Sequence, residues 1–338
     1  MNKLLALGLL LLGGAFLWPL NAAAFDRGEV ETFATLPAGN ANPEGIAADK
    51  QGNIYVTTFA PTAPAGTPGR LFVFNPHGNL IRQVDIAGSS SALLGLDFHP
   101  QTGALLVIDF GAKTVLKVHP VTGQSTVFAT VTGGAGLNAL TFDKGGNVYI
   151  SDSFQGIIWK TGPSGGAAAA WVADALLTTT GVPGFGANGV GFNKAFSLLF
   201  VANTGNDTIV QIPVASSGTP GTPTVLTNSI NGADGLILDE HDNIWVCANQ
   251  ADEIVVIDKT GKVIAKLGDF DGIDKHGAPD GLLFPASPVR VGDWLYVTNL
   301  SLDLRKVGGP QTVDSQWADQ VTSHTVARLR ARIPRLHD

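Results

Sequence analysis

Oxygen-bearing side chains recur at one point of an internal sequence repeat. They are Glu44, Asn138, Asn188, Asp234 and Asp280, and each comes directly before a glycine or alanine and a short apolar run. Carboxylate and amide oxygens are the ligands that Ca²⁺ prefers, whereas Zn²⁺ and Cu²⁺ favour His or Cys. Two carboxylates, Glu44 and Asp234, already balance the charge of one divalent cation. The sequence therefore favours a Ca²⁺ site, or a site for another divalent cation, at Glu44, Asn138, Asn188 and Asp234, with Asp280 as a third carboxylate or an outer group.

The strands that carry these side chains follow from the repeat itself. Its clearest copies place residues 42–49 (Asn-Pro-Glu-Gly-Ile-Ala-Ala-Asp) before 52–56 (Gly-Asn-Ile-Tyr-Val), 139–143 before 146–150, and 234–239 before 242–246. With three weaker copies, the repeat recurs six times at intervals of 44 to 50 residues. Each copy reads as four short strands, which in the fifth copy are 236–239, 244–248, 253–258 and 263–267. Four-stranded repeats of this length are typical of propeller blades.

The ends of the chain complete the predicted ring of blades. The sixth copy ends with a single strand at 325–333, and a lone strand at 29–36 precedes the first copy. We therefore predict an all-β, six-bladed β-propeller, closed by N-terminal strand pairing into the C-terminal blade, with residues 25–338 as one domain. The recurring oxygen-bearing residues, with Leu94 in the second blade, then form a ring at one mouth of the central channel. The alternative is turn chemistry, because Asp or Asn before Gly is common in turns.

Composition and charge limit the classes of function. The 338 residues include 42 Gly, only 14% are charged, and the formal net charge is −7. This composition favours many short strands over a helix bundle, and the acidic balance argues against a nucleic-acid partner. The single cysteine, Cys247, cannot form an internal disulfide.

The first residues have the pattern of an export signal. An apolar run at 4–20 precedes Ala22-Ala23-Ala24, which has the small-residue pattern of a signal-peptidase site. We expect residues 1–24 to be a removed signal peptide and the mature chain to be secreted or periplasmic. No later segment is long and apolar enough to cross a membrane, so we expect no membrane contact after cleavage.

The ordered quartet and the six copies together resemble the SMP-30/gluconolactonase/LRE-like family, whose six-bladed propellers are related to paraoxonases and diisopropyl-fluorophosphatase. The resemblance extends over essentially the whole mature chain. Its most specific part is the ordered quartet: Glu in Pro-Glu-Gly of the first copy, Asn in the third, Asn-Gly in the fourth and Asp-Gly in the fifth. It implies one divalent cation, usually calcium, held by Glu44, Asn138, Asn188 and Asp234. It also implies that Asp234 is the catalytic carboxylate.

The chain departs from the sugar-lactone members that it resembles. These have Arg two residues before the third-copy Asn and Asp directly after it, where this chain has Gly136 and Ala139. The loops expected at the same mouth bring apolar residues instead, namely Phe59, Phe110, Phe154 and Phe185, with Leu94 in the ring. A sugar hydroxyl buried unpaired against such walls costs about 1–3 kcal/mol. We expect a small-molecule substrate that is a less polar lactone or ester, although the phenylalanines equally suit packing between blades.

The chemistry expected of such a site is metal-assisted hydrolysis. Asp234 is the first candidate for the catalytic carboxylate and Asp280 the second. His276 is a candidate base or substrate contact, with a solvated loop histidine as the alternative. A long polar insertion at 300–323 is a candidate lid over the mouth.

Two other functions fit the same repeat. One is a non-enzymatic propeller of the NHL-repeat type that binds a peptide or protein. The other is a different reaction on the same scaffold, similar to strictosidine synthase or streptogramin lyase, because a fold does not fix its chemistry. The ring favours hydrolysis, since a binding propeller has no reason to gather Glu, two Asn and Asp around one point.

Overall fold

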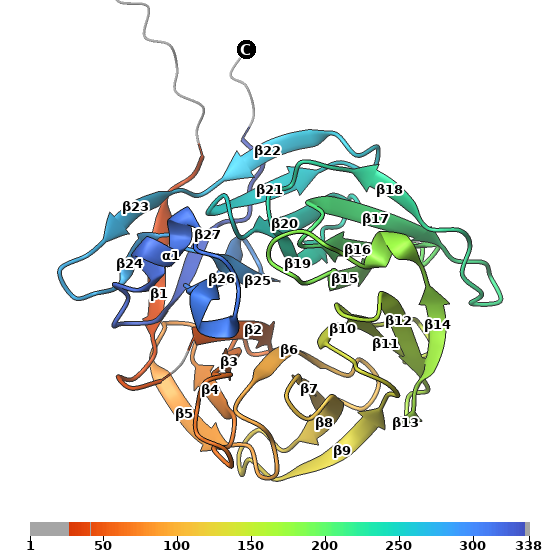
Figure 1. Cartoon of the computed structure of the whole chain (residues 1–338), viewed down its shortest axis with the longest axis horizontal. Coiled ribbons are helices and arrows are strands. Elements are labelled where there is room, and N and C mark those ends of the chain that lie inside the picture. The colour runs from red at the N-terminus through yellow and green to blue at the C-terminus, as the bar shows by residue number, and fades with distance from the viewer. Residues whose placement is uncertain (1–26, 41, 335–338) are drawn as a thin grey trace, which may run out of the picture.

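The computed structural model describes residues 27–40 and 42–334, so the predicted leader at 1–24 lies outside the described residues. Six antiparallel sheets are arranged in a ring as the blades of a β-propeller (Figure 1). The predicted all-β, six-bladed fold is confirmed. Within the described ranges, no helix has the length and apolar character needed to cross a membrane.

The first three blades follow one another along the chain, each numbered from its innermost strand outward. Blade 1 contains β2 (Asn42–Ala48), β3 (Ile54–Phe59), β4 (Arg70–Phe74) and β5 (Leu80–Asp85). Blade 2 contains β6 (Leu93–Phe98), β7 (Leu105–Asp109), β8 (Thr114–Val118) and β9 (Ser125–Thr130), with the short β13 (Gly166–Ala167) added outside β9. Blade 3 contains β10 (Leu137–Phe142), β11 (Val148–Asp152), β12 (Ile157–Thr161) and β14 (Ala169–Ala173), followed by the short helix η1 (Ala175–Leu177).

The remaining blades repeat this plan. Blade 4 contains β15 (Ala187–Phe192), β16 (Leu198–Asn203), β17 (Thr208–Pro213) and β18 (Thr224–Thr227). Blade 5 contains β19 (Ala233–Leu238), β20 (Ile244–Ala248), β21 (Glu253–Ile257) and β22 (Val263–Leu267). Blade 6 contains β25 (Pro285–Val291), β26 (Trp294–Asn299), β27 (Thr325–Arg330) and, outermost, β1 (Val30–Thr35).

The N-terminal strand closes the ring, as the sequence predicted. β1 pairs antiparallel with β27, with Val30 opposite Leu329 and Thr35 opposite Thr325. An ion pair of 2.6 Å between Arg328 and Glu31 joins the same two strands. The first and last described strands of the chain are therefore held together in one blade.

The Gly-Asn-Ile-Tyr-Val repeat builds a turn after the first strand of a blade. In blade 1, one carboxylate oxygen of Asp49 accepts hydrogen bonds from the backbone N–H groups of Gln51 and Asn53, and the other accepts from the Asn53 amide and the Tyr55 hydroxyl. Asp143 and Asp239 make corresponding networks in blades 3 and 5. The strongest sequence signal thus belongs to the scaffold, at the end of the first strand away from the ring.

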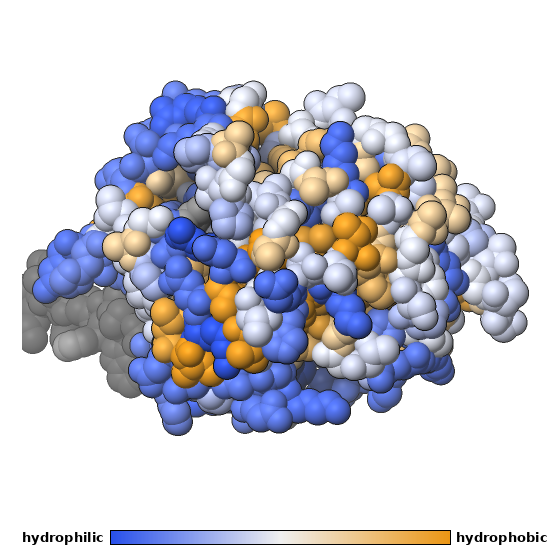
Figure 2. All heavy atoms as spheres, turned by 90° about the horizontal axis from the view of Figure 1, so that it is seen from below, coloured by the Kyte–Doolittle hydropathy of each residue, from blue (hydrophilic) through white to orange (hydrophobic). Residues whose placement is uncertain are grey.

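The apolar core lies between adjacent blades, where residues of neighbouring sheets pack together. One such cluster combines Leu105 and Val107 of blade 2 with Leu71 and Val73 of blade 1, all of them buried. The outer strands are more polar, and their exposed apolar residues include Ile81 on β5. Figure 2 shows the molecule from its side, with small apolar groups separated by hydrophilic residues. On this face the surface therefore carries no continuous apolar band.

The sixth blade differs from the sequence-based assignment. The place of Asp280 in the repeat predicts the innermost strand at 280–284, but that strand is β25, a few residues further on. Asp280 and Gly281 instead belong to a separate hairpin of β23 (Phe270–Ile273) and β24 (Pro279–Gly281). The prediction was wrong because this hairpin repeats the Asp-Gly-Leu signal, whereas β25 begins with Pro-Ala-Ser-Pro and has no glycine.

The insertion at 300–323 connects β26 to β27 and carries two short helices, η2 (Leu304–Val307) and α1 (Val313–Ala318). In Figure 1 it lies on the face of the propeller that is turned to the viewer. Trp317 of α1 packs edge-on against Phe270 of the hairpin, with ring centroids 5.4 Å apart. The insertion is thus an ordered element that contacts the neighbouring hairpin.

Candidate active site

The innermost strand of every blade contributes one residue to a ring around the channel. In each blade the pairing with the second strand skips two residues, and the first of these two is the ring residue. The six ring residues are Glu44, Leu94, Asn138, Asn188, Asp234 and Ala286. The sixth position therefore belongs to Ala286, and the prediction of Asp280 for it was wrong.

The small residue after the ring residue is required by packing between blades. A side chain at Gly45 would meet the backbone oxygen of Leu94 at 2.2 Å, and one at Gly235 would meet that of Ala286 at 2.5 Å. The innermost strands of adjacent blades thus approach backbone to backbone. The ring residues lie within strands, so the turn explanation of the Asp-Gly and Asn-Gly pairs is wrong.

A second ring lies beside the first, at the end of the second strand of each blade. Its members, in blade order, are Phe59, Phe110, Ser153, Thr204, Asn249 and Leu300. In blades 3, 4 and 5 both rings are polar. We call these six residues (Asn138, Asn188, Asp234, Ser153, Thr204 and Asn249) the polar half of the mouth. Blades 6, 1 and 2 supply the apolar half, namely Ala286, Leu300, Phe59, Leu94 and Phe110, together with a single acid, Glu44.

The second ring fixes the orientation of the two amides. The Ser153 hydroxyl donates its proton to the backbone oxygen of Ala187 at 2.7 Å, so it accepts from the Asn138 amide nitrogen at 3.3 Å. Thr204 acts in the same way between the backbone oxygen of Ala233 (2.8 Å) and the Asn188 amide nitrogen (3.0 Å). A hydroxyl has only one proton to donate. Each amide nitrogen is thereby held by a hydroxyl, which leaves the amide oxygen for a ligand.

The two ring carboxylates are buried and each has an oxygen without a partner. Glu44 and Asp234 are each 4% exposed, and Glu44 Oε2 and Asp234 Oδ1 accept no hydrogen bond within the described part of the chain. Burial raises the pKa of Asp234 to about 7. Burial also raises the pKa of Glu44 well above its ordinary value, and the nearby Asp234 charge adds to that rise. Two buried acids without a cationic partner are costly, and a divalent cation between them removes that cost. The residues present therefore fit such an ion.

Asn249 is a site residue that the sequence reasoning missed. It is 1% exposed, its amide nitrogen donates to Asp234 Oδ2 at 2.8 Å, and its amide oxygen has no partner in the described structure. It therefore holds one oxygen of Asp234 in place and adds another acceptor to the cavity. Comparing the ends of the second strands across copies, where it aligns with Ser153 and Thr204, would have found it.

The ring borders a small cavity of about 40 Å³. Glu44, Asn138, Asn188 and Asp234 line it, and the rest of its lining is mainly apolar, with Leu300, Leu302 and Leu304 of the insertion among it. A water molecule needs about 10–15 Å³ on this measure, and small-molecule sites usually enclose about 300–1,000 Å³. In this conformation the cavity has room for an ion and water but not for a lactone.

The phenylalanines predicted for the substrate pocket divide into two groups. Phe59, Phe185 and the ring residue Leu94 line the cavity. Phe110 packs behind them against Phe59, Phe154 and Phe185, with centroid distances of 5.8, 5.7 and 6.1 Å. Phe154 is 51% exposed and lies outside the cavity lining. The four rings thus form one aromatic cluster, of which only part faces the site.

Two predicted catalytic residues lie away from the site. Asp280 is exposed on β24, and His276 is exposed at the tip of the same hairpin. Neither lines the cavity. Because the hairpin lies outside the ring of first strands, neither side chain shares the site with Glu44 or Asp234. The structure therefore does not support their predicted roles.

Comparisons with known proteins agree with this geometry. The model of the SMP-30/Gluconolactonase/LRE-like region matches residues 98–268, just over half of the chain. No curated protein matches the chain in sequence. Among solved structures, a gluconolactonase from Xanthomonas campestris has a TM-score of 0.62 at 13% identity, with 91% of each chain covered.

Two further structures are similar over most of their length. Regucalcin from Agrobacterium tumefaciens, described as a calcium-binding protein, has a TM-score of 0.61 at 15% identity, with 90% of this chain and 98% of the other covered. A luciferin-regenerating enzyme has a TM-score of 0.61 at 16% identity, with 89% and 95% covered. At these identities the likeness to solved structures shows the fold.

Proposed function

The chain belongs to the SMP-30/gluconolactonase/LRE-like family, and we propose that it is a metal-dependent hydrolase of a lactone or ester less polar than a sugar lactone. The first candidate for its metal is Ca²⁺, held by Glu44, Asn138, Asn188 and Asp234. The observation that carries this proposal is the pair of buried carboxylate oxygens without partners beside two amides held by hydroxyls. The lactonase and calcium-binding descriptions of the similar structures support the same activity.

A divalent cation bound by the quartet would polarise the substrate carbonyl and stabilise the negative charge that develops on its oxygen. The chain's own residues position the other groups. Asn249 holds Asp234 Oδ2, so Asp234 Oδ1 is the oxygen free to accept a proton. A carboxylate at this position, beside the bound cation and the substrate, is a candidate general base.

The reaction balances with water as the only co-reactant. The water oxygen bonds to the carbonyl carbon, and Asp234 Oδ1 takes the proton that the water loses. The bond between the carbonyl carbon and the ring oxygen then breaks, and the proton passes to the departing alkoxide. The product is a hydroxy acid, and Asp234 returns to its starting state.

The apolar half of the mouth sets the proposed substrate class. Leu94, Phe59 and Phe185 line the cavity, and no cationic side chain occurs among the described residues that line it. A sugar lactone would bury hydroxyls against these walls at about 1–3 kcal/mol each. An aliphatic or aryl lactone fits this surface better.

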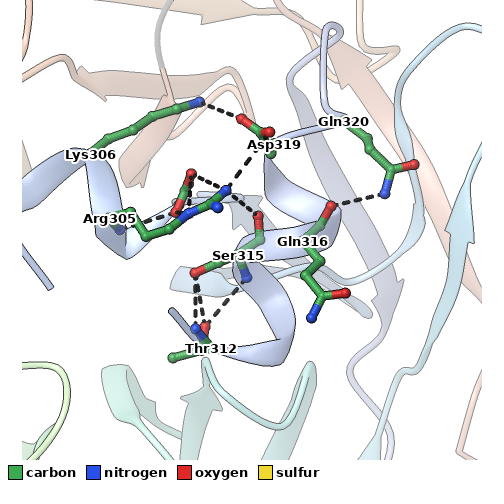
Figure 3. Close-up of polar contacts among 8 residues, drawn as sticks. Arg305, Lys306, Thr312, Ser315, Gln316, Asp319 and Gln320 are labelled. Atoms are coloured by element: carbon green, nitrogen blue, oxygen red, sulfur yellow. Dashed lines mark hydrogen bonds and ion pairs between the residues drawn. The ribbon is translucent and has the colours of Figure 1, made fainter. Parts of the chain in front are cut away.

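A lactone needs a wider space than the cavity has in this conformation. Leu300, Leu302 and Leu304 belong to the insertion and line the cavity. The insertion is held by its own polar contacts, in which Arg305 pairs with Asp303 at 2.9 Å and Lys306 with Asp319 at 3.6 Å (Figure 3). We propose that these contacts let the insertion move as a unit and act as a lid.

The location of the enzyme is part of the proposal. The apolar run at 4–20 and the Ala22-Ala23-Ala24 site support export and removal of residues 1–24. The substrate would then be a small molecule met outside the cytoplasm.

Hydrolysis of a panel of lactones and esters by residues 25–338 tests the function. We expect turnover of aliphatic or aryl lactones that is lost on chelation and restored by Ca²⁺, and little turnover of sugar lactones. Glu44→Gln should abolish the response to Ca²⁺. Turnover that survives chelation, or a clear preference for sugar lactones, would contradict the proposal.

A further inference from the structure

A second hollow of about 290 Å³ adjoins the cavity. It lies between the blade 1 loop at 60–69 and the helix η2 of the lid, and Leu302 lines both hollows. We call it the side groove. Its polar lining includes Asn40, Asn42, Thr58, Thr62, Arg70 and Lys306. At this volume it approaches the size of ordinary small-molecule sites, about 300 Å³ and more.

The charge of the side groove is opposite to that of the cavity. Arg70 and Lys306 line the groove, and no carboxylate does so in the described part of the chain. The cavity has two acids, Glu44 and Asp234, and no base among its described lining residues. The two hollows therefore suit ligands of different charge, with the Leu302 side chain between them.

Both cations of the groove keep donors for a ligand. One guanidinium nitrogen of Arg70 donates to Asn40 at 2.5 Å and another lies 3.2 Å from Asp85. The guanidinium has five N–H donors in all. The Lys306 ammonium is 3.6 Å from Asp319 (Figure 3), and its side chain is 55% exposed. A guanidinium and an ammonium both bind carboxylates through charge-assisted hydrogen bonds.

Hydrolysis of a neutral lactone produces such an anion next to the groove. The hydroxy acid product is ionised at neutral pH, and the cavity in which it forms has mainly apolar walls. A carboxylate is costly to hold against apolar surface without a donor. We propose, on the basis of the proposed hydrolase function, that the side groove is a product site. It binds the carboxylate of the hydroxy acid through Arg70 and Lys306 after the acid passes Leu302.

Calorimetric binding of 6-hydroxyhexanoate tests this site without turnover, with neutral 1,6-hexanediol as the comparison ligand. We expect the wild-type protein to bind 6-hydroxyhexanoate but not the diol. Binding of the carboxylate should be weaker at high salt than at low salt. Lys306→Gln should weaken binding about fivefold, the effect of one exposed ion pair. Arg70→Gln should weaken it at least as much. Lys117→Gln, which removes an exposed lysine from β8 in blade 2, should leave binding unchanged.

The outcomes separate this inference from the proposed function. Equal binding by the wild-type protein and the Lys306→Gln and Arg70→Gln variants would overturn the side groove as a carboxylate site, whether or not lactones are hydrolysed. Carboxylate binding that depends on Lys306, in a protein that hydrolyses no lactone, would keep the groove as an anion site but overturn its role in product release. Product inhibition that weakens in the Arg70→Gln variant, with an unchanged KM for the neutral lactone, would support both.

Discussion

The polar and apolar halves of the channel mouth occupy equivalent positions of the same repeat, yet their chemistry is opposite. In blades 3 to 5 each ring residue is an Asn or Asp held by a hydroxyl or an amide from the second strand. In blades 6, 1 and 2 the same two positions are Ala286 with Leu300, Glu44 with Phe59, and Leu94 with Phe110. Glu44 thus stands alone on the apolar side.

This difference separates two tasks that one site must perform. The polar half fixes oxygen atoms in place by hydrogen bonds from the second ring, as a cation requires. The apolar half provides the surface against which a substrate packs. Glu44, from blade 1, supplies the second carboxylate, so that the charge of a divalent ion is balanced.

The largest effect is expected from Asp234→Asn, which removes a carboxylate from the polar half. Turnover should fall by about 10²–10⁴-fold, because a general base and a cation ligand are lost together. Without a cation, the same substitution should stabilise the folded protein, because a neutral side chain replaces a buried acid whose pKa is raised. Activity assays and thermal melts in chelator and in Ca²⁺ check both effects.

Asp280→Asn is the matched control for that variant. The same chemical change on the exposed hairpin should leave turnover and melting temperature unchanged. A loss of turnover in this variant would show that Asp280 acts in the site, and it would contradict the assignment of Ala286 as the sixth ring residue.

Leu94→Asn is expected to have the next largest effect, because it makes the apolar half resemble the polar one. We expect kcat/KM for an apolar lactone to fall about tenfold, the size of a modest loss of apolar contact. The ratio of sugar-lactone to apolar-lactone turnover should rise. Competition assays with the two lactones measure this ratio, and an unchanged ratio would refute the role of the apolar half in specificity.

Thr204→Val tests the amide orientation in the polar half. The variant keeps the shape of the side chain but cannot accept from the Asn188 amide nitrogen. We expect Ca²⁺ affinity to fall about tenfold, as for other groups that orient metal ligands. Calcium titration measures the change. Affinity equal to that of the wild-type protein would show that Thr204 does not orient the ligand.

The smallest expected effect comes from an acid behind the apolar half. Asp252 accepts the backbone N–H of Phe284, a cavity residue, at 2.7 Å. Burial raises the pKa of Asp252 to about 7, whereas its pKa in the unfolded chain is about 4. Between these values the folded protein binds more protons than the unfolded chain, so the contribution of Asp252 to the free energy of unfolding falls as pH rises.

Asp252→Asn should therefore stabilise the protein by about 1 kcal/mol at pH 8 and by less at pH 5. Denaturant unfolding at the two pH values measures the difference. A stabilisation of equal size at both would show that the titration of Asp252 is not its cause.

The fold could be predicted because its signals are local. The Asp-turn networks at Asp49, Asp143 and Asp239 require the Asp, Asn and Tyr or Trp residues that make the repeat visible in the sequence. The quartet could be predicted for a related reason, since close packing of the first strands requires a small residue after each ring member, as at Gly45 and Gly235.

The parts that could not be predicted depend on contacts between distant segments. In blade 6 the ring residue Ala286 is followed by Ser287, where most other blades have glycine. The Asp280-Gly281 pair of the hairpin therefore aligned with the repeat in its place. Asn249 directly follows the second strand of blade 5, and its part in the site rests on its hydrogen bond to Asp234. Leu302 and Leu304 line the cavity because of the way in which the insertion folds back over it.

Calorimetric titration of Ca²⁺ into chelator-treated protein of residues 25–338, with lactone turnover measured on the same samples, tests whether the mouth holds a catalytic cation. We expect one ion bound per chain and turnover that rises in parallel with occupancy. We also expect both to be lost in Glu44→Gln. Binding without any dependence of turnover, or no binding and no change in melting temperature, would contradict a catalytic cation at the polar half of the mouth.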